Sequence, residues 1–316
     1  EIFRIMKKKL RIGVDIGGTF TDIVAIHENS ENYEIVKVPS IPTNYMLGIK
    51  DGLKELFQKQ KWNPSEVELF FHGTTVATNT VIEKKGALTG LLTTQGFRDV
   101  LEVGRTSRPP IDLYNLSMER PAPLVPRHLR LEVPERIDYR GNIVKPLDEA
   151  ETIKKTKKLL EKGIQALAIS LINSYANPLH EIQVREIVQS LQPNLYIALS
   201  SDVNPQFKEF ERTSTTILSA YVGPKVCQYI QEIENMLSGM NIRTTLHIMQ
   251  ASGGAMTAAA VKDRAVCTIL SGPAAGVLGA LKVGKTMGEK NLVSFDMGGT
   301  STDVSLVNDG QLMIVD

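Results

Sequence analysis

The sequence predicts an α/β protein with a mixed β-sheet, and three observations support this fold class. Three apolar or alternating runs between residues 10 and 38 indicate a strand meander, because a glycine pair at 17–18 and a polar stretch at 28–32 supply its turns. Apolar strand patterns alternate with helical patterns between residues 148 and 200. Helical spacing of apolar residues then continues over most of residues 207–237.

The first half of the chain supports this fold element by element. Helical spacing of leucines predicts a helix over 45–60, and short apolar runs predict strands at 68–71 and 88–93. A helix at about 76–85 is expected between these strands. Residues 96–146 are rich in proline and arginine with weak periodicity, which indicates an elaborated loop or small inserted subdomain.

In the second half, side-chain caps mark two helix starts. Asp148 is expected to cap a helix that ends near residue 162, and Asn177 with Pro178 opens another that ends near residue 191. The helical region at 207–237 is expected to be interrupted near Gly223 and Pro224. The other expected elements are strands at 164–172, 196–200, 242–250, 265–270 and 291–296, a helix at 273–287 and a final hairpin of 302–306 with 312–315.

Composition limits the function classes. The length of 316 residues is typical of about two domains, and 36 basic against 35 acidic residues give a net charge of +1. This balance argues against a nucleic-acid partner or an acidic-membrane surface, and no apolar stretch is long enough to span a membrane. Two cysteines without metal-ligand spacing favour a reducing, cytoplasmic setting. Residues 1–9 are expected to be a tail, of which residues 1–5 precede the methionine as an extension.

An internal repeat carries most of the functional information. The segment Asp15–Asp22 (DIGGTFTD) recurs 281 residues later as Asp296–Asp303 (DMGGTSTD), with six of eight positions identical. Each copy follows one apolar strand pattern and precedes another. The sequence therefore predicts the same strand, glycine turn and strand twice in one chain.

This pattern is suited to binding a polyphosphate. Paired glycines bring backbone N–H groups close to an anion without Cβ clashes, and nearby hydroxyls add donors. The aspartates that begin the copies, Asp15 and Asp296, are expected to hold Mg²⁺ because magnesium prefers oxygen ligands. The predicted phosphate contacts are Gly17, Gly18, Thr19 and Thr21 in the first copy and Gly298, Gly299, Thr300 and Ser301 in the second. The alternative is a pair of hairpins whose glycines only turn the chain, but turn geometry alone does not require matched aspartates and threonines.

The two motifs resemble the paired phosphate motifs of the actin/hexokinase/Hsp70 superfamily, and their particular form is similar to the hydantoinase A/5-oxoprolinase family. The resemblance runs from residue 10 to residue 316. It implies an actin-like ATPase (ribonuclease H-like) lobe over residues 10–290 and the truncated start of a second lobe over 291–316. Further matching segments are Phe71–Asn79 (FHGTTVATN), Gly104–Pro109 (GRTSRP), Glu209–Thr216 (EFERTSTT), Met249–Gly254 (MQASGG) and Ser271–Gly276 (SGPAAG).

The matching segments supply the remaining candidate site residues. His72 and Thr74 join Asp15 and Asp296 as expected catalytic residues, because they begin a Gly/Thr-rich turn ahead of a helix. Gly272 is expected to contact the nucleotide. The expected substrate contacts are Gly73, Thr75, Asn79, Arg105, Arg108, Ser252, Gly253 and Gly254, with the two arginines placed to recognise a carboxylate or phosphate.

Competing interpretations remain beside this one. A Walker A match at 279–286 lies inside a predicted helix, so it lacks the strand that precedes a P-loop. Glu209, Glu211 and Arg212 share one helix, where a purely structural ion pair is favoured. The remaining histidines lack metal-ligand spacing.

The family resemblance implies an ATP-dependent hydrolase that phosphorylates the amide oxygen of a hydantoin, 5-oxoproline or similar lactam before ring opening. Such a chain would work with a second, hydantoinase B-type subunit, and this portion alone would be inactive. The alternatives are an ATP-dependent ketone carboxylase subunit and a non-catalytic actin-like nucleotide-binding module.

Overall fold

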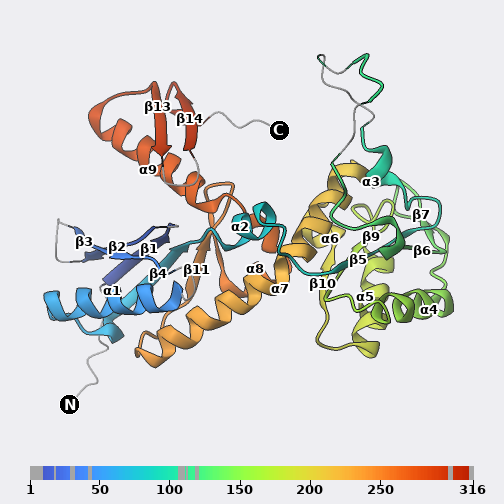
Figure 1. Ribbon diagram of the computed structural model, residues 1–316, viewed down its shortest axis with the longest axis horizontal. Helices are drawn as coiled ribbons and strands as arrows, with labels where there is room; N and C mark the ends of the chain where they lie inside the picture. Colours follow the sequence, from blue (N-terminus) through green and yellow to red (C-terminus); the bar gives the residue numbers. More distant parts are fainter. Residues whose placement is uncertain are drawn as a thin grey trace. The chain divides into compact units, whose positions relative to one another are not determined.

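The computed structural model describes residues 10–17, 19–28, 33–41, 45–105, 111, 113–117, 121–297 and 302–312. The chain divides into two compact units (Figure 1). Unit 1 contains Glu1–Ile82, Cys227–Val261 and Cys267–Asp316, and unit 2 contains Glu83–Val226 and Lys262–Val266. The limits of the predicted first lobe, residues 10 and 290, stay a prediction.

A six-stranded mixed sheet forms the centre of unit 1, in the order β12-β11-β4-β1-β2-β3. The first three strands form an antiparallel meander, whereas β4 runs parallel to β1 and β11 runs parallel to β4. The predicted mixed sheet and meander are confirmed. The strands are β1 (Leu10–Ile16), β2 (Phe20–His27), β3 (Tyr33–Pro39), β4 (Val67–Gly73), β11 (Leu246–Met249) and β12 (Ala255–Thr257).

Helix α1 (Tyr45–Gln60) packs on β2 and β3, as predicted from its apolar spacing. Its buried residues Ile49, Leu53 and Leu56 recur every three to four positions, so they form one stripe against the sheet. Gly52 allows a close approach, because a Cβ atom there would lie 2.6 Å from Cδ1 of Ile23. A 3₁₀ turn, η1 (Pro64–Glu66), then leads into β4 behind a capping box formed by Asn63.

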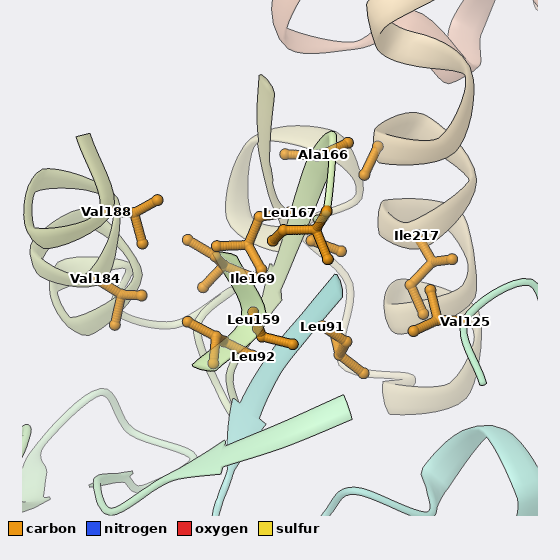
Figure 2. Packing of buried hydrophobic residues seen from close by; sticks show 14 of the residues in the cluster. Leu91, Leu92, Val125, Leu159, Ala166, Leu167, Ile169, Val184, Val188 and Ile217 are labelled. Atoms are coloured by element: carbon orange, nitrogen blue, oxygen red, sulfur yellow. The ribbon is translucent and has the colours of Figure 1, made fainter. Parts of the chain in front are cut away.

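Unit 2 is built on a four-stranded parallel sheet in the order β10-β9-β5-β6. Every residue of β5 and β9 is buried, which matches the continuous apolar runs expected of a parallel sheet covered on both faces (Figure 2). The predicted insert at 96–146 contributes β6 to this sheet. The elements of this unit are β5 (Thr89–Thr94), α3 (Val100–Val103), η3 (Arg127–Leu129), β6 (Arg130–Val133), β7 (Arg136–Ile137), β8 (Ile143–Lys145), α4 (Glu149–Leu160), β9 (Ala166–Ser170), α5 (Leu179–Leu191), β10 (Tyr196–Leu199) and α6 (Ser200–Val203).

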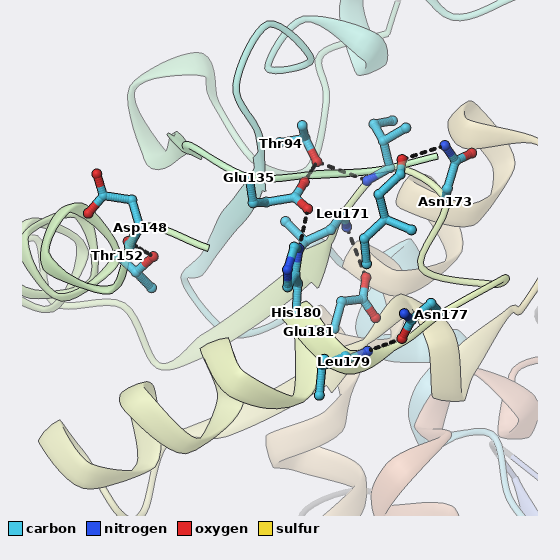
Figure 3. A network of polar contacts seen from close by, with 12 residues as sticks. Thr94, Glu135, Asp148, Thr152, Leu171, Asn173, Asn177, Leu179, His180 and Glu181 are labelled. Atoms are coloured by element: carbon cyan, nitrogen blue, oxygen red, sulfur yellow. Dashed lines mark hydrogen bonds and ion pairs between the residues drawn. The ribbon is translucent and has the colours of Figure 1, made fainter. Parts of the chain in front are cut away.

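The predicted cap of Asp148 is present, whereas Asn177 lies one residue before the cap position of its helix and still accepts a backbone N–H there. Oδ1 of Asp148 accepts the backbone N–H of Glu151 at 3.0 Å. Oδ1 of Asn177 accepts that of Leu179 at 3.0 Å (Figure 3). Helix α5 begins at Leu179, one residue after Pro178, so the proline takes the cap position instead of the first helical position. Each such cap satisfies a backbone donor that the helix itself leaves unpaired.

Two buried carboxylates lie close to the carboxyl edge of the unit 2 sheet. Glu135 accepts a hydrogen bond from Thr94 and lies 2.7 Å from Nδ1 of His180 (Figure 3). Glu181 accepts the backbone N–H of Leu171 at 2.9 Å and the Oγ–H of Ser200 at 2.6 Å. Burial raises the pKa of Glu181, while these donors oppose the rise. The network therefore stabilises the loops that follow the strands.

Helix α7 (Glu209–Gly239) continues through Pro224, so the predicted interruption is wrong. The proline removes one backbone donor, but Val222, Val226 and Ile230 are buried on the same helix. Packing of this apolar surface outweighs the local penalty. Gly223 serves packing instead of a break, because a Cβ atom there would clash with the ring of Tyr196.

Unit 1 also contains α2 (Val76–Ile82), α9 (Ser271–Met287) and a second sheet of β13 (Leu292–Met297), β14 (Thr302–Asn308) and β15 (Gln311–Leu312). The boundary between the two units passes through α8 (Ala258–Asp263) and η4 (Ala265–Thr268). The predicted strand at 265–270 is wrong, since residues 265–268 form the 3₁₀ helix η4. A short apolar run fits either structure, and periodicity alone does not distinguish them. The Walker A match lies within α9, as predicted, so no P-loop forms there.

Candidate functional site

Three parallel strands of unit 1 end at one edge of its sheet. Asp15 at the end of β1 is paired in register with Gly73 at the end of β4, and β11 ends beside β4 at Met249. Ligands of α/β sheets bind outside the carboxyl ends of such strands. The N-terminus of α9 reaches the same place, because a Cβ atom on Gly272 would lie 3.8 Å from Oδ1 of Asp15.

Asp15 is surrounded by other negative charge. Its side chain reaches solvent, but neighbouring atoms partly desolvate it, and this burial raises its pKa above the ordinary value. Repulsion from Asp22 and from Asp296 raises the pKa further. Asp22 is paired with Nζ of Lys37 at 2.9 Å. The two repeated motifs therefore bring their first aspartates close enough for direct electrostatic interaction.

The first glycine turn is held by Ser40, a residue that the sequence did not indicate. Its Oγ–H donates to the carbonyl of Gly17 at 2.8 Å, and its N–H donates to the carbonyl of Thr19 at 2.9 Å. Its hydroxyl also lies 3.0 Å from that of Thr21. Thr21 is fully buried, and its phosphate contact stays a prediction. Thr19 is exposed at the turn.

Gly73 and Thr74 form the turn between β4 and α2. Gly73 has no room for a side chain, because a Cβ atom would lie 2.8 Å from Oδ1 of Asp15. Thr74 is buried; its Oγ1 accepts the N–H of Val76 at 3.2 Å, and its carbonyl accepts the Oγ–H of Ser271 at 3.1 Å. Thr74 therefore connects the turn to α9, and in this structure its hydroxyl caps α2 instead of facing a ligand.

His72 lies below this edge, fully buried in the unit 1 core. Its Nε2 is 2.7 Å from the hydroxyl of Tyr229 on α7. Burial lowers the pKa of His72 to about 4, so the ring is neutral at physiological pH. The ring contacts Tyr229 within the core, and the expected catalytic role of His72 stays a prediction. Tyr229 was not indicated by any local sequence signal.

The remaining candidates of unit 1 belong to two turns. Nδ2 of Asn79 donates to Oγ1 of Thr75 at 3.3 Å, so these side chains bind each other on the first turn of α2. Gly253 has a φ of 83°, and a Cβ atom there would lie 2.9 Å from Leu278 of α9. The turn at 252–254 is closed by the N–H of Gln250, which donates to the carbonyl of Gly254 at 2.8 Å.

Comparisons with known proteins agree with this geometry. The profile of the hydantoinase/oxoprolinase N-terminal region matches residues 11–192, and that of hydantoinase/oxoprolinase matches residues 212–316. The chain belongs to the hydantoinase/oxoprolinase family. Family membership confirms the resemblance inferred from the repeated motifs, and the predicted fold class is confirmed as well.

Two relatives and one solved structure illustrate the range of this family. Caprolactamase subunit alpha of Pseudomonas jessenii is 35% identical over 309 residues, which cover 96% of this chain and 44% of that protein. The 5-oxoprolinase of Saccharomyces cerevisiae is 32% identical over 351 residues, covering 98% of this chain and 26% of that protein. The nucleotide-free structure of acetone carboxylase, described as ATP-dependent, superposes with a TM-score of 0.86 at 31% identity and covers 96% of this chain and 45% of its own. The chain thus spans less than half the length of these relatives.

Other family residues predicted from the sequence lie elsewhere. Arg105 belongs to unit 2, where its Nε donates to Oε1 of Glu211 at 2.5 Å. Arg105 therefore forms an ion pair within unit 2, and its recognition of an anion stays a prediction. Six predicted site residues lie outside the described residues, namely Gly18, Arg108, Gly298, Gly299, Thr300 and Ser301.

Two searches of the described residues gave negative results. No cluster of three or more histidine, cysteine, aspartate or glutamate side chains is placed to hold a metal ion within the described ranges. No helix in the described part of the chain is sufficiently long and apolar to cross a membrane. The first finding is compatible with a magnesium ion held mainly by phosphates, because Mg²⁺ in nucleotide sites uses only one or two carboxylates.

Proposed function

We propose that this chain forms the first half of an ATP-dependent enzyme that phosphorylates the carbonyl oxygen of a cyclic amide before the ring is opened. The observation that carries the proposal is the strand edge where Asp15 lies beside Gly73 and the start of α9, and where the charge of Asp296 also acts on Asp15. Carboxylates that repel each other beside two glycine turns are stabilised by a divalent cation and its bound phosphates.

Different residues of unit 1 would bind Mg²⁺ and the phosphates of ATP. Asp15 and Asp296 would hold Mg²⁺, and the backbone N–H groups around Gly17 and Thr19 would bind the phosphates. Gly272, at the start of α9, lies beside Asp15, where a helix N-terminus favours an anion. The second glycine turn, residues 298–301, is proposed to bind the phosphates from the opposite wall.

The reaction follows from phosphoryl transfer. The bond between the β–γ bridging oxygen and the γ-phosphorus breaks, ADP leaves, and the lactam oxygen gains the phosphoryl group. Water attack at the activated carbon then breaks the ring C–N bond, and hydrolysis of the remaining acyl phosphate releases phosphate. Catalysis of the first step depends mainly on positioning and charge stabilisation. Carboxylation of a ketone shares this first step, and the similarity to acetone carboxylase favours it as the second candidate.

We further propose that residues 291–316 begin a second lobe and that the enzyme contains a second subunit of the hydantoinase B type. Relatives named as subunits of caprolactamase and of acetone carboxylase support a multi-subunit assembly. The exposed apolar face of β13 and β14 supports further chain packing on this sheet. A chain without these parts is expected to be inactive, and a cytoplasmic setting remains our expectation.

Substitution of Asp15 tests the proposal in the complete enzyme. Asp15→Asn keeps the side-chain volume but removes the charge that holds the cation, so we expect ATP-dependent ring opening to fall about a hundredfold to a thousandfold. Asp51→Asn on α1, which removes an exposed acid, is the matched control. Activity of the Asp15 variant within twofold of the unsubstituted enzyme would contradict the proposal. Parallel assays with lactams and with ketones plus labelled bicarbonate separate hydrolase from carboxylase.

A further inference from the structure

A row of register partners crosses the unit 1 sheet next to the first glycine turn. The row consists of Gly73 on β4, Asp15 on β1, Asp22 on β2 and Lys37 on β3. Side chains of antiparallel register partners point to the same face of a sheet, with Cβ atoms about 4.5–5.5 Å apart. Asp22 therefore lies beside the proposed cation ligand Asp15, and Lys37 lies on the far side of Asp22.

The ammonium group of Lys37 is held by two residues of the first repeated motif. Its Nζ donates to both carboxylate oxygens of Asp22, at 2.9 and 3.1 Å. The same atom lies 5.0 Å from the centroid of the Phe20 ring, which is within the range of a cation–π contact. Ser40, which directly follows β3, fixes this end of the strand to the glycine turn through hydrogen bonds to two turn carbonyls. The positive charge of Lys37 therefore has a defined position beside the turn.

Exposure of this ion pair limits what it contributes to folding. The side chains of Lys37 and Asp22 are 54% and 41% exposed, and exposed pairs of this kind add little to the free energy of unfolding. Their charges have more effect on a ligand that is itself highly charged. Without Lys37, the charge of Asp22 would be added to those of Asp15 and Asp296 at the edge where a triphosphate is proposed to bind.

We infer that Lys37 is a positioning residue of the proposed ATP site, which acts by compensating the charge of Asp22. The inference rests on the proposed function, which places ATP and Mg²⁺ at this edge. With Asp22 paired, Asp15 and Asp296 are the carboxylates left to hold the cation, and the triphosphate meets less repulsion at the first glycine turn. Removal of the Lys37 charge should therefore act oppositely on the two ligands, since the added negative charge repels the triphosphate and attracts the magnesium ion. A damaged turn would instead bind both more weakly.

Measurements of ATP binding to the complete enzyme separate these two effects. The affinity for ATP is measured by calorimetry in EDTA and again with saturating Mg²⁺, at low ionic strength. Lys37→Met should weaken metal-free ATP binding about threefold to tenfold, and it should raise the factor by which Mg²⁺ tightens that binding by about as much. Both changes should shrink at high salt, because charges that face solvent are screened.

Three further variants distinguish charge compensation from damage to the fold. Lys37→Arg keeps the charge and should stay within about twofold of the unsubstituted enzyme in both quantities. Asp22→Asn in the Lys37→Met background removes the charge that Lys37 compensates, so it should restore metal-free ATP affinity to within about twofold. Lys59→Met is the matched control, because Lys59 is 57% exposed and pairs with Glu34 near the opposite end of β3. This control should leave both quantities unchanged.

Three results would overturn the inference. They are unchanged ATP binding in Lys37→Met, weakening by the same factor with and without Mg²⁺, and failure of the second substitution to restore affinity. If Lys37→Met does not fold, Asp22→Asn alone gives the reverse test, because it should tighten metal-free ATP binding and reduce the effect of Mg²⁺.

Failure of the proposed function has a separate signature, namely an unsubstituted enzyme that does not bind ATP or an Asp15→Asn variant that retains activity. ATP binding that depends on Asp15 but is indifferent to Lys37→Met would overturn this inference alone.

Discussion

The two repeated hairpins have the same strand pairing but opposite burial. Asp15 pairs with Asp22 in the first, and Asp296 pairs with Asp303 in the second. On one face of β1 and β2 the residues Ile12, Val14, Ile16, Ile23 and Ala25 are all buried. The matching face of β13 and β14 carries Val293, Phe295, Met297, Val304 and Leu306, which are between 53% and 70% exposed.

The difference comes from the partners of each hairpin. Helix α1 packs on β2, and β4 extends the first hairpin into a six-stranded sheet. In the described part of the chain, the second hairpin has α9 on its other face and only β15 beside it. The motif therefore determines the turn and register, whereas burial depends on segments far away in the sequence. The following substitutions test this comparison.

The largest effect is expected at the strand beside the first hairpin. Gly73→Ala places a Cβ atom 2.8 Å from Oδ1 of Asp15 and displaces the carboxylate, so we expect ATP-dependent turnover of the complete enzyme to fall about a hundredfold. Gly13→Ala is the control, because its Cβ atom would meet only a carbonyl oxygen at 4.0 Å. Equal activity of the two variants would show that Asp15 does not need its observed position.

A smaller effect is expected from one pair of valines. Val14→Ala in the first hairpin removes buried methyl groups and should lower the free energy of unfolding by about 2 kcal/mol. Val304→Ala in the second hairpin alters an exposed side chain and should change it by less than about 0.5 kcal/mol. Chemical denaturation of the 316-residue chain measures both. If the proposed second lobe covers this face in the complete enzyme, Val304→Ala should there lower the free energy of unfolding by nearly as much as Val14→Ala does.

The smallest effect concerns the support below the first hairpin. Tyr229→Phe leaves Nε2 of buried His72 without its partner and should lower the free energy of unfolding by about 1 kcal/mol, measured by denaturation at pH 7.5 or another pH above the ordinary histidine pKa. No change would mean that the contact is energetically neutral.

The pKa of His72 also predicts how the free energy of unfolding changes with pH. The pKa of His72 is about 4 in the folded protein and 6.5 ordinarily, so the unfolded chain binds the extra proton between these values. The contribution of the neutral, buried His72 ring to the free energy of unfolding is fully present above about pH 6.5 and is lost as pH falls toward 4. The free energy of unfolding is measured as a function of pH for the unsubstituted protein and for His72→Gln. The variant should lack the loss that His72 causes as pH falls from 6.5 toward 4.

Local signals predicted much of the fold correctly. The strands of the meander, helix α1 and the capping contacts of Asp148 and Asn177 depend on patterns within a few residues. Long-range packing explains the errors. Pro224 remains helical because buried residues around it hold α7 together, and residues 265–268 form a 3₁₀ helix that periodicity did not distinguish from a strand.

The candidate site shows the same division. Asp15 and Asp296 were predicted from the repeat and Gly73 from the Gly/Thr-rich turn that follows a strand, since this chemistry is visible in the local sequence. Ser40 and Tyr229 were missed because each acts on a residue far away in the sequence, namely Gly17 and His72. His72 was predicted to be catalytic because its motif lies at a strand end, and local sequence did not predict its burial or its contact with Tyr229.

The sequence by itself determined the strand pairing of the two hairpins and the positions of the aspartates that begin the motifs, because these depend on backbone conformation and short-range pairing. Only the tertiary structure decided that Asp15 and Asp296 repel each other, that Thr21 and His72 are buried, and that Arg105 pairs with Glu211. Charge interaction, desolvation and ion pairing depend on distances between segments, and a single sequence does not contain those distances.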